Sequence, residues 1–121
     1  MKTVLVIDDD VSTRTIVRSF LEKAGFTVYE AEDGKAGIKL FMEHPADLVV
    51  VDIFMPEKDG IETISDILGQ SQGCKILAIS GGGAMNNLDM LRFSKILGAG
   101  EILVKPFSRT ELLAAVERLG V

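Results

Sequence analysis

The sequence predicts an α/β fold in which five strand–helix units, (βα)5, form one doubly wound parallel sheet. Two observations lead to this prediction. Short runs of consecutive apolar residues alternate along the 121-residue chain with segments whose apolar residues recur at helical spacing. No linker or low-complexity segment separates them, so the connections are short. Strands and helices that alternate in this way form a parallel sheet through right-handed crossovers, which place helices on both faces.

Five stretches are predicted to be strands. Four are nearly uninterrupted apolar runs, at residues 4–7, 48–51, 75–79 and 102–104, and the runs at 48–51 and 75–79 are expected to be buried strands. Residues 27–31 alternate weakly between apolar and polar side chains, which is typical of an edge strand or a half-covered strand.

An amphipathic helix is predicted after each strand. The apolar faces are formed by Ile16, Val17, Phe20, Leu21 and Ala24; by Ala36, Ile38, Phe41 and Met42; by Ile61, Ile64, Ile67 and Leu68; by Leu88, Leu91, Ile96 and Leu97; and by Leu112, Leu113, Val116 and Leu119. Gly25 is expected to end the first helix, because glycine tolerates the positive φ that follows a helix. Asp33-Gly34 indicates a turn before the second helix. Ser108 and Glu111 have the spacing of a capping box, which predicts the start of the last helix.

The expected topology indicates which strand ends meet. Winding outward in both directions from the first strand produces the flavodoxin-like order 2-1-3-4-5, whose ligand site lies at the carboxyl edge between strands one and three. Those two strands end in Asp8-Asp9 and in Asp52, and the fourth and fifth end in Ser80 and Lys105. Because neighbouring strands lie ~4.8 Å apart, we expect these five side chains to converge.

Three carboxylates at one edge repel one another unless a cation neutralises them. Oxygen ligands without histidine or cysteine favour Mg²⁺, which shares its coordination sphere with phosphate. We therefore expect Asp8 and Asp9 to hold the metal. Asp52, on the middle strand, is the expected nucleophile that becomes an aspartyl phosphate, while Lys105 and Ser80 bind the phosphoryl oxygens. Each residue alone would be interpreted as a turn or loop residue, and only their convergence favours a site.

These motifs, in order and each after a strand, resemble the receiver domain of two-component response regulators, of the single-domain chemotaxis type. The resemblance runs through residues 6–10, 51–56, 59–60, 79–81 and 104–107. It implies that Asp52 accepts its phosphoryl group from a phosphohistidine on a sensor histidine kinase or histidine phosphotransferase, with only limited self-phosphorylation and self-dephosphorylation. It also implies that the Phe54 carbonyl completes the Mg²⁺ ligands, and that the Lys105-Pro106 bond is cis. Gly81, after Ser80, belongs to the switch region.

One position departs from the pattern of the family. Receivers commonly carry an aromatic residue or histidine three residues before the lysine, and here that residue is Ile102. We expect phosphorylation nevertheless to change the face formed by the fourth helix, fifth strand and fifth helix, through Ser80 and the glycines that begin at Gly81. Neither Phe54 nor Gly82 offers a polar group to orient an attacking water, which predicts slow self-dephosphorylation.

Composition excludes several classes of protein. The net charge of −5, from 18 acidic and 13 basic residues, disfavours direct binding of nucleic acid. No apolar run approaches the ~20 residues of a membrane-spanning helix, and the N-terminus has no secretory signal pattern. Cys74 has no second cysteine to pair with. We expect a cytoplasmic protein, with residues 1–121 forming the receiver and no output domain, so that the signal passes to a separate, unidentified target protein.

Three alternatives stay open at this point. Asp8, Asp10 and Ser12 fit a D-x-D-x-S signature similar to that of haloacid-dehalogenase-type phosphatases, in which Asp8 would be the nucleophile. Asp10 is otherwise interpreted as an acid at a helix start. A degenerate receiver would only dock partners, although the site residues are complete. The run Gly81–Gly83 is weak support for a nucleotide-binding loop, since no complete glycine-rich motif is present.

Overall fold

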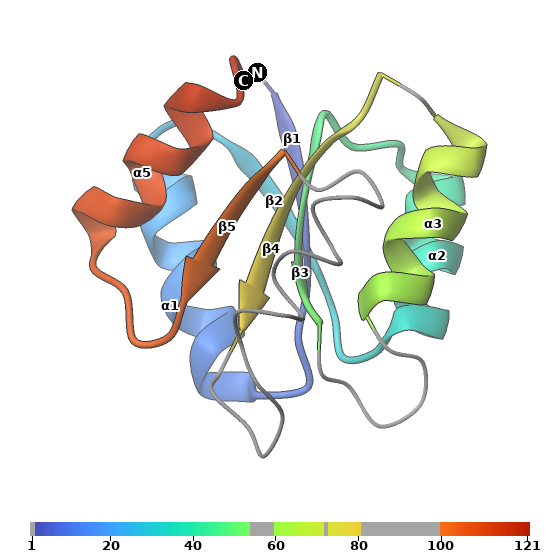
Figure 1. The fold of residues 1–121 in the computed structure, drawn as a ribbon, viewed down its shortest axis with the longest axis horizontal. Coiled ribbons are helices and arrows are strands. Elements are labelled where there is room, and N and C mark those ends of the chain that lie inside the picture. Colours follow the sequence, from blue (N-terminus) through green and yellow to red (C-terminus); the bar gives the residue numbers. More distant parts are fainter. Residues whose placement is uncertain (1, 54–59, 72, 81–99) are drawn as a thin grey trace.

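The computed structural model describes residues 2–53, 60–71, 73–80 and 100–121. Within these ranges the five expected strands form one parallel sheet in the order β2-β1-β3-β4-β5 (Figure 1). The strands are β1 (Thr3–Ile7), β2 (Thr27–Ala31), β3 (Leu48–Asp52), β4 (Lys75–Ser80) and β5 (Glu101–Val104). The helices are α1 (Val11–Lys23), α2 (Gly34–Glu43), α3 (Gly60–Gln70) and α5 (Arg109–Arg118). The helix predicted over residues 86–97 lies outside the described ranges.

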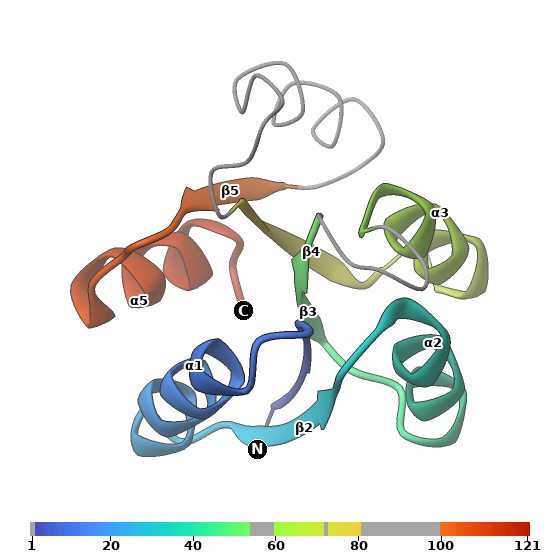
Figure 2. The same ribbon diagram turned by 90° about the horizontal axis from the view of Figure 1, so that it is seen from below.

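The sheet separates two apolar cores. Figure 2 shows α1 and α5 on one face of the sheet and α2 and α3 on the other. Because side chains alternate along a strand, β3 contributes to both cores. Val49 and Val51 pack with α2 and α3, whereas Leu48 and Val50 pack with α1 and α5. Burial on both faces explains why this strand is an uninterrupted apolar run.

Local signals set the helix boundaries. The Asp10 side chain accepts a hydrogen bond from the backbone N–H of Ser12, which makes Asp10 the N-cap of α1. Gly25 has a φ of 97° directly after that helix, as predicted. Ser108 and Glu111 form both hydrogen bonds of the capping box at the start of α5.

Two parts of the sequence prediction are wrong, the separate turn at Asp33-Gly34 and the burial of four residues assigned to helix faces. Asp33-Gly34 is not a separate turn, because Asp33 caps α2 directly and Gly34 is its first residue. Ile16 and Met42 were expected on buried helix faces but are 49% and 63% exposed. A surface helix buries only the stripe that faces the sheet, and both residues lie at the margin of that stripe. Ala36 is exposed for the same reason, and Ala24 is exposed as the C-cap residue that follows the end of α1 at Lys23. No helix in the described part of the chain is long and apolar enough to cross a membrane.

Candidate functional site

Three carboxylates meet at the carboxyl edge of the sheet. Ile7 of β1 pairs with Val51 of β3, so Asp8 and Asp52 follow at adjacent positions of neighbouring strands. One carboxylate oxygen from each of Asp8, Asp9 and Asp52 lies within 4.8 Å of the other two. Asp8 and Asp52 are buried, whereas Asp9 is exposed. The group therefore faces solvent on one side only.

Lys105 joins two of these carboxylates. Its ammonium nitrogen lies 2.9 Å from Asp8 Oδ2 and 3.2 Å from Asp52 Oδ2. The backbone brings it there, since Lys105 follows β5 directly and its N–H donates to the Ser80 carbonyl at 2.8 Å. The Lys105-Pro106 peptide bond is cis, as expected. The structure thus brings together residues that are 53 positions apart in the chain.

Burial and charge act against each other at this site. Burial raises the pKa of the Asp8 carboxyl group, and hydrogen bonding from Asp10 and Lys105 opposes the shift without cancelling it. For Lys105, burial alone would lower the pKa, but hydrogen bonds and attraction to Asp8 and Asp52 outweigh burial and raise it. Lys105 therefore stays charged at neutral pH, while Asp8 ionises less readily than an ordinary aspartic acid.

The donor atoms fit a divalent cation. Asp8 Oδ2 is buried, and Lys105 Nζ forms an ion pair with it at 2.9 Å. Three carboxylates set against one ammonium leave an excess of negative charge when all are ionised. Mg²⁺ would neutralise this excess, and carboxylate oxygens are the ligands that it prefers. Asp8, Asp9 and Asp52 are the residues that would hold it.

Ser80 reaches the same edge from β4. Asp52 pairs with Ile79 in the register of β3 and β4, so Ser80 lies one residue further toward the carboxyl edge, and it is fully buried. The other two predicted members of the site, the Phe54 carbonyl and Gly81, lie outside the described residues.

Comparison with known proteins identifies the family. The family model for the response regulator receiver domain matches residues 4–117. The chain belongs to this family. The protein CcdB of Bacillus subtilis is 37% identical over 120 residues, covering 98% of each chain. The chemotaxis protein CheY of Listeria monocytogenes is 33% identical over 119 residues, also covering 98% of each. The structure of CheY4 from Vibrio cholerae superimposes with a TM-score of 0.88 at 30% identity, covering 98% of each chain.

Membership of this family makes the chain a component of two-component signalling, and it disfavours the phosphatase alternative. The structure provides an independent argument against that alternative. Asp10, the second acid of the phosphatase signature, accepts hydrogen bonds from Ser12 N–H at 3.0 Å and from the Thr13 hydroxyl at 2.8 Å. These bonds lower the pKa of Asp10. Its side chain is thus engaged in capping α1.

Ile102 occupies the position at which many receivers carry an aromatic ring. It is half-buried on β5 and packs against the core beneath α2 and α3. An aliphatic side chain fills this place without a polar atom or a planar ring. Any conformational coupling through this position must therefore rest on aliphatic packing.

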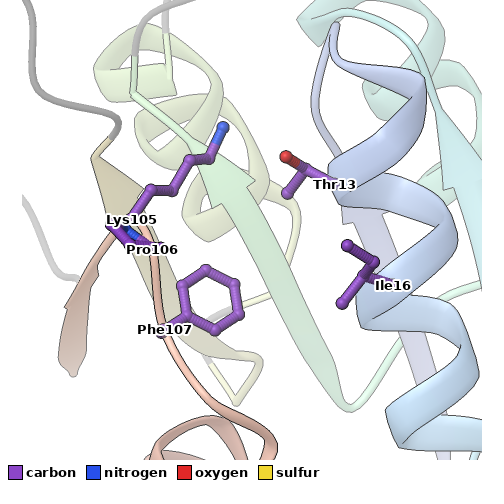
Figure 3. A pocket seen from close by; sticks show the side chains of 5 residues that line it. All are labelled: Thr13, Ile16, Lys105, Pro106 and Phe107. Atoms are coloured by element: carbon purple, nitrogen blue, oxygen red, sulfur yellow. The ribbon is translucent and has the colours of Figure 1, made fainter.

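Two features of the site were not predicted from the sequence. Arg14 of α1 donates from Nη1 to the Asp8 carbonyl at 2.6 Å. An open hollow of about 180 Å³ lies beside the carboxylates, lined by Thr13, Ile16, Lys105, Pro106 and Phe107. Figure 3 shows that its walls come from α1 and from the segment after β5. No sequence signal indicated the hollow, because Ile16 was predicted to lie on a buried helix face and only the packing of the two elements leaves it exposed.

Proposed function

We propose that the chain is a phosphorylation-activated signalling switch in which Asp52 accepts a phosphoryl group while Asp8, Asp9 and Asp52 hold Mg²⁺. The observation that carries the proposal is the double contact of Lys105 with Asp8 and Asp52. It supports the expected convergence of a nucleophile, metal ligands and a fixed cation. The Phe54 carbonyl, as the further metal ligand, stays a prediction, as does a cytoplasmic location.

In the proposed reaction an Asp52 carboxylate oxygen attacks the phosphorus atom of a phosphohistidine. The new O–P bond forms as the N–P bond breaks, and the electron pair of that bond stays on the departing imidazole. Lys105 offers a point charge to one phosphoryl oxygen and Ser80 offers a hydroxyl to another. Bound Mg²⁺ would supply further charge neutralisation to the phosphoryl group. Phosphoryl transfer needs mainly positioning and charge stabilisation. Side chains that already lie together at the carboxyl edge of the sheet provide both.

The phosphodonor is proposed to be a sensor histidine kinase or a histidine phosphotransferase that docks over the hollow beside Lys105 (Figure 3). Two observations support this place. Lys105 lines both the hollow and the carboxylate site, so a partner seated there reaches Asp52. Ile16 exposes half of an apolar side chain at the rim, where a partner would bury it.

The output is proposed to pass through the face that carries β5, α5 and the predicted fourth helix, toward a separate target protein. Fluoroberyllate, which mimics a bound phosphoryl group, should change amide exchange in β5 and the segment leading to α5. No change there would contradict this part of the proposal.

Labelling with radioactive acetyl phosphate tests the central claim. The wild type should take up label in the presence of Mg²⁺ and lose this ability in EDTA. Asp52→Asn should abolish labelling, and Asp9→Asn should reduce it by weakening the metal site. Asp33→Asn is the matched control, because it removes a carboxylate that caps α2 and asparagine caps equally well. Label that persists in Asp52→Asn, or that does not depend on Mg²⁺, would refute the proposal.

A further inference from the structure

Arg14 links the proposed metal site to the rest of the fold. Its guanidinium donates from Nη1 to the Asp8 backbone carbonyl at 2.6 Å, and Nε lies 3.3 Å from Glu30 Oε1 at the end of β2. The side chain is only 15% exposed. A planar guanidinium that engages two acceptors is held in one orientation, because its donors have a fixed geometry.

The contact with Asp8 completes a set of hydrogen bonds around the acidic loop, which is formed by residues 8–10. The Asp8 N–H donates to the Ala31 carbonyl at 3.1 Å, and Asp8 Oδ1 accepts from the Asp10 N–H at 2.8 Å. The Arg14 N–H donates in turn to the Asp10 carbonyl at 3.1 Å. Since a peptide group is planar, anchoring the Asp8 carbonyl also sets the direction in which the chain enters Asp9. Arg14 thereby acts on both metal ligands of this loop without touching either carboxylate.

Arg18 provides the comparison that isolates this role. It lies one turn further along α1, and its Nη1 is 2.7 Å from Glu30 Oε2. Arg14 and Arg18 therefore share Glu30 and both tie α1 to β2. Arg14 alone of these two arginines has a hydrogen bond to Asp8 in the described structure.

We propose that Arg14 is a positioning residue for Mg²⁺ binding, which holds the Asp8-Asp9 peptide group in the orientation that presents both carboxylates to the ion. The inference rests on the proposed function, because it assumes that the three carboxylates bind Mg²⁺. Partners that orient metal ligands typically contribute about tenfold or more to metal affinity, since a ligand that is already ordered loses less freedom on binding.

The test is titration of metal-free protein with Mg²⁺ by calorimetry, without any phosphodonor, for the wild type, Arg14→Met, Arg14→Lys and Arg18→Met. Arg14→Met should bind Mg²⁺ about tenfold more weakly, and Arg18→Met should bind as the wild type does. Arg14→Lys should lie between them, because an ammonium can donate to the Asp8 carbonyl but cannot also hold Glu30. Urea unfolding in EDTA measures the loss of stability of each variant separately, and a merely structural role would lower the stability of Arg14→Met without weakening Mg²⁺ binding by the folded protein.

Equal Mg²⁺ affinity in Arg14→Met and the wild type, or equal loss in Arg14→Met and Arg18→Met, would overturn the inference and leave the proposed function intact. If Arg14→Met does not fold, Arg14→Lys carries the test, and wild-type affinity in that variant would overturn the inference. A wild-type protein that does not bind Mg²⁺ would overturn the proposed function together with this inference.

Discussion

Replacing the buried Asp52 with asparagine should stabilise the metal-free protein. Three carboxylate oxygens, one each from Asp8, Asp9 and Asp52, lie within 4.8 Å of one another, and Lys105 Nζ lies 3.2 Å from Asp52 Oδ2. At an effective dielectric constant of about 20, like unit charges at the larger distance repel by about 3.5 kcal/mol, and opposite charges at the smaller distance attract by about 5 kcal/mol. Asp52→Asn removes two such repulsions and one attraction, which favours the variant by about 2 kcal/mol.

Solvent reduces this difference. Asp9 is exposed, so its repulsion of Asp52 is partly screened, and we expect a gain of about 1 kcal/mol in the free energy of unfolding. For a chain of this length, that gain corresponds to a rise in Tm of about 4 °C. Relief from burying a charged carboxylate acts in the same direction, because asparagine carries no charge to desolvate.

Urea unfolding followed by circular dichroism in EDTA measures this effect. The matched control is Asp47→Asn, at the opposite edge of the sheet, where Asp47 Oδ2 accepts from the Thr3 N–H at 2.9 Å and an amide oxygen can accept equally well. Asp47→Asn should leave the free energy of unfolding unchanged. Adding Mg²⁺ should stabilise the wild type more than Asp52→Asn, since the variant lacks one ligand. An Asp52→Asn protein that is no more stable than the wild type in EDTA would refute the electrostatic reasoning.

Three further predictions concern other parts of the chain. Gly37→Ala should lower the free energy of unfolding by about 1–3 kcal/mol, because the new Cβ would lie 2.4 Å from Ile7 Cδ1 in the core. Gly69→Ala is the control, since a Cβ there has open space, and it should raise the free energy of unfolding by about 0.5–1 kcal/mol. Thermal unfolding measures both variants, and equal effects would contradict the packing argument. Burial raises the pKa of Cys74 to about 11, so alkylation of its thiol should be slow until urea unfolds the protein. The free energy of unfolding should also fall as pH rises from 9.0 toward that value, because the folded state keeps the thiol proton to a higher pH than the unfolded state does. Rapid alkylation of the folded protein would count against this prediction. Ile16→Ala should slow phosphotransfer from the kinase roughly fivefold, since truncation of a docking contact typically costs about 1 kcal/mol of binding free energy. Labelling by acetyl phosphate needs no docked partner and should be unchanged. Equal slowing of both reactions would argue against docking at the hollow.

Much of the site could be predicted from strand ends alone. Asp8, Asp52 and Lys105 were expected to meet because each directly follows a predicted strand, and the structure places them in contact or close to it. Asp10 was interpreted as a helix-start acid, and it caps α1. These predictions needed only the alternation of strands and helices and the rule that parallel strands share a carboxyl edge.

Other features could not be predicted in this way. Periodicity assigned Ile16 and Met42 to buried faces, because it measures the direction of a side chain around the helix axis and not the width of the contact with the sheet. Arg14 carried no signal, since its role depends on the length and rotamer of a side chain that crosses from α1 to a carbonyl of the neighbouring loop. The hollow beside Lys105 depends on two elements that are far apart in sequence.

The sequence by itself determined the order of strands, the two cores and the identity of the residues at the carboxyl edge. These follow from the period of side-chain direction and from the handedness of crossovers, which are properties of local chain geometry. The tertiary structure alone decided that Lys105 bridges Asp8 and Asp52, that Arg14 holds the Asp8 carbonyl, and that Ile16 is left exposed. Such contacts depend on side-chain reach and packing to within an ångström, and the pattern of residue types does not encode distances at that scale.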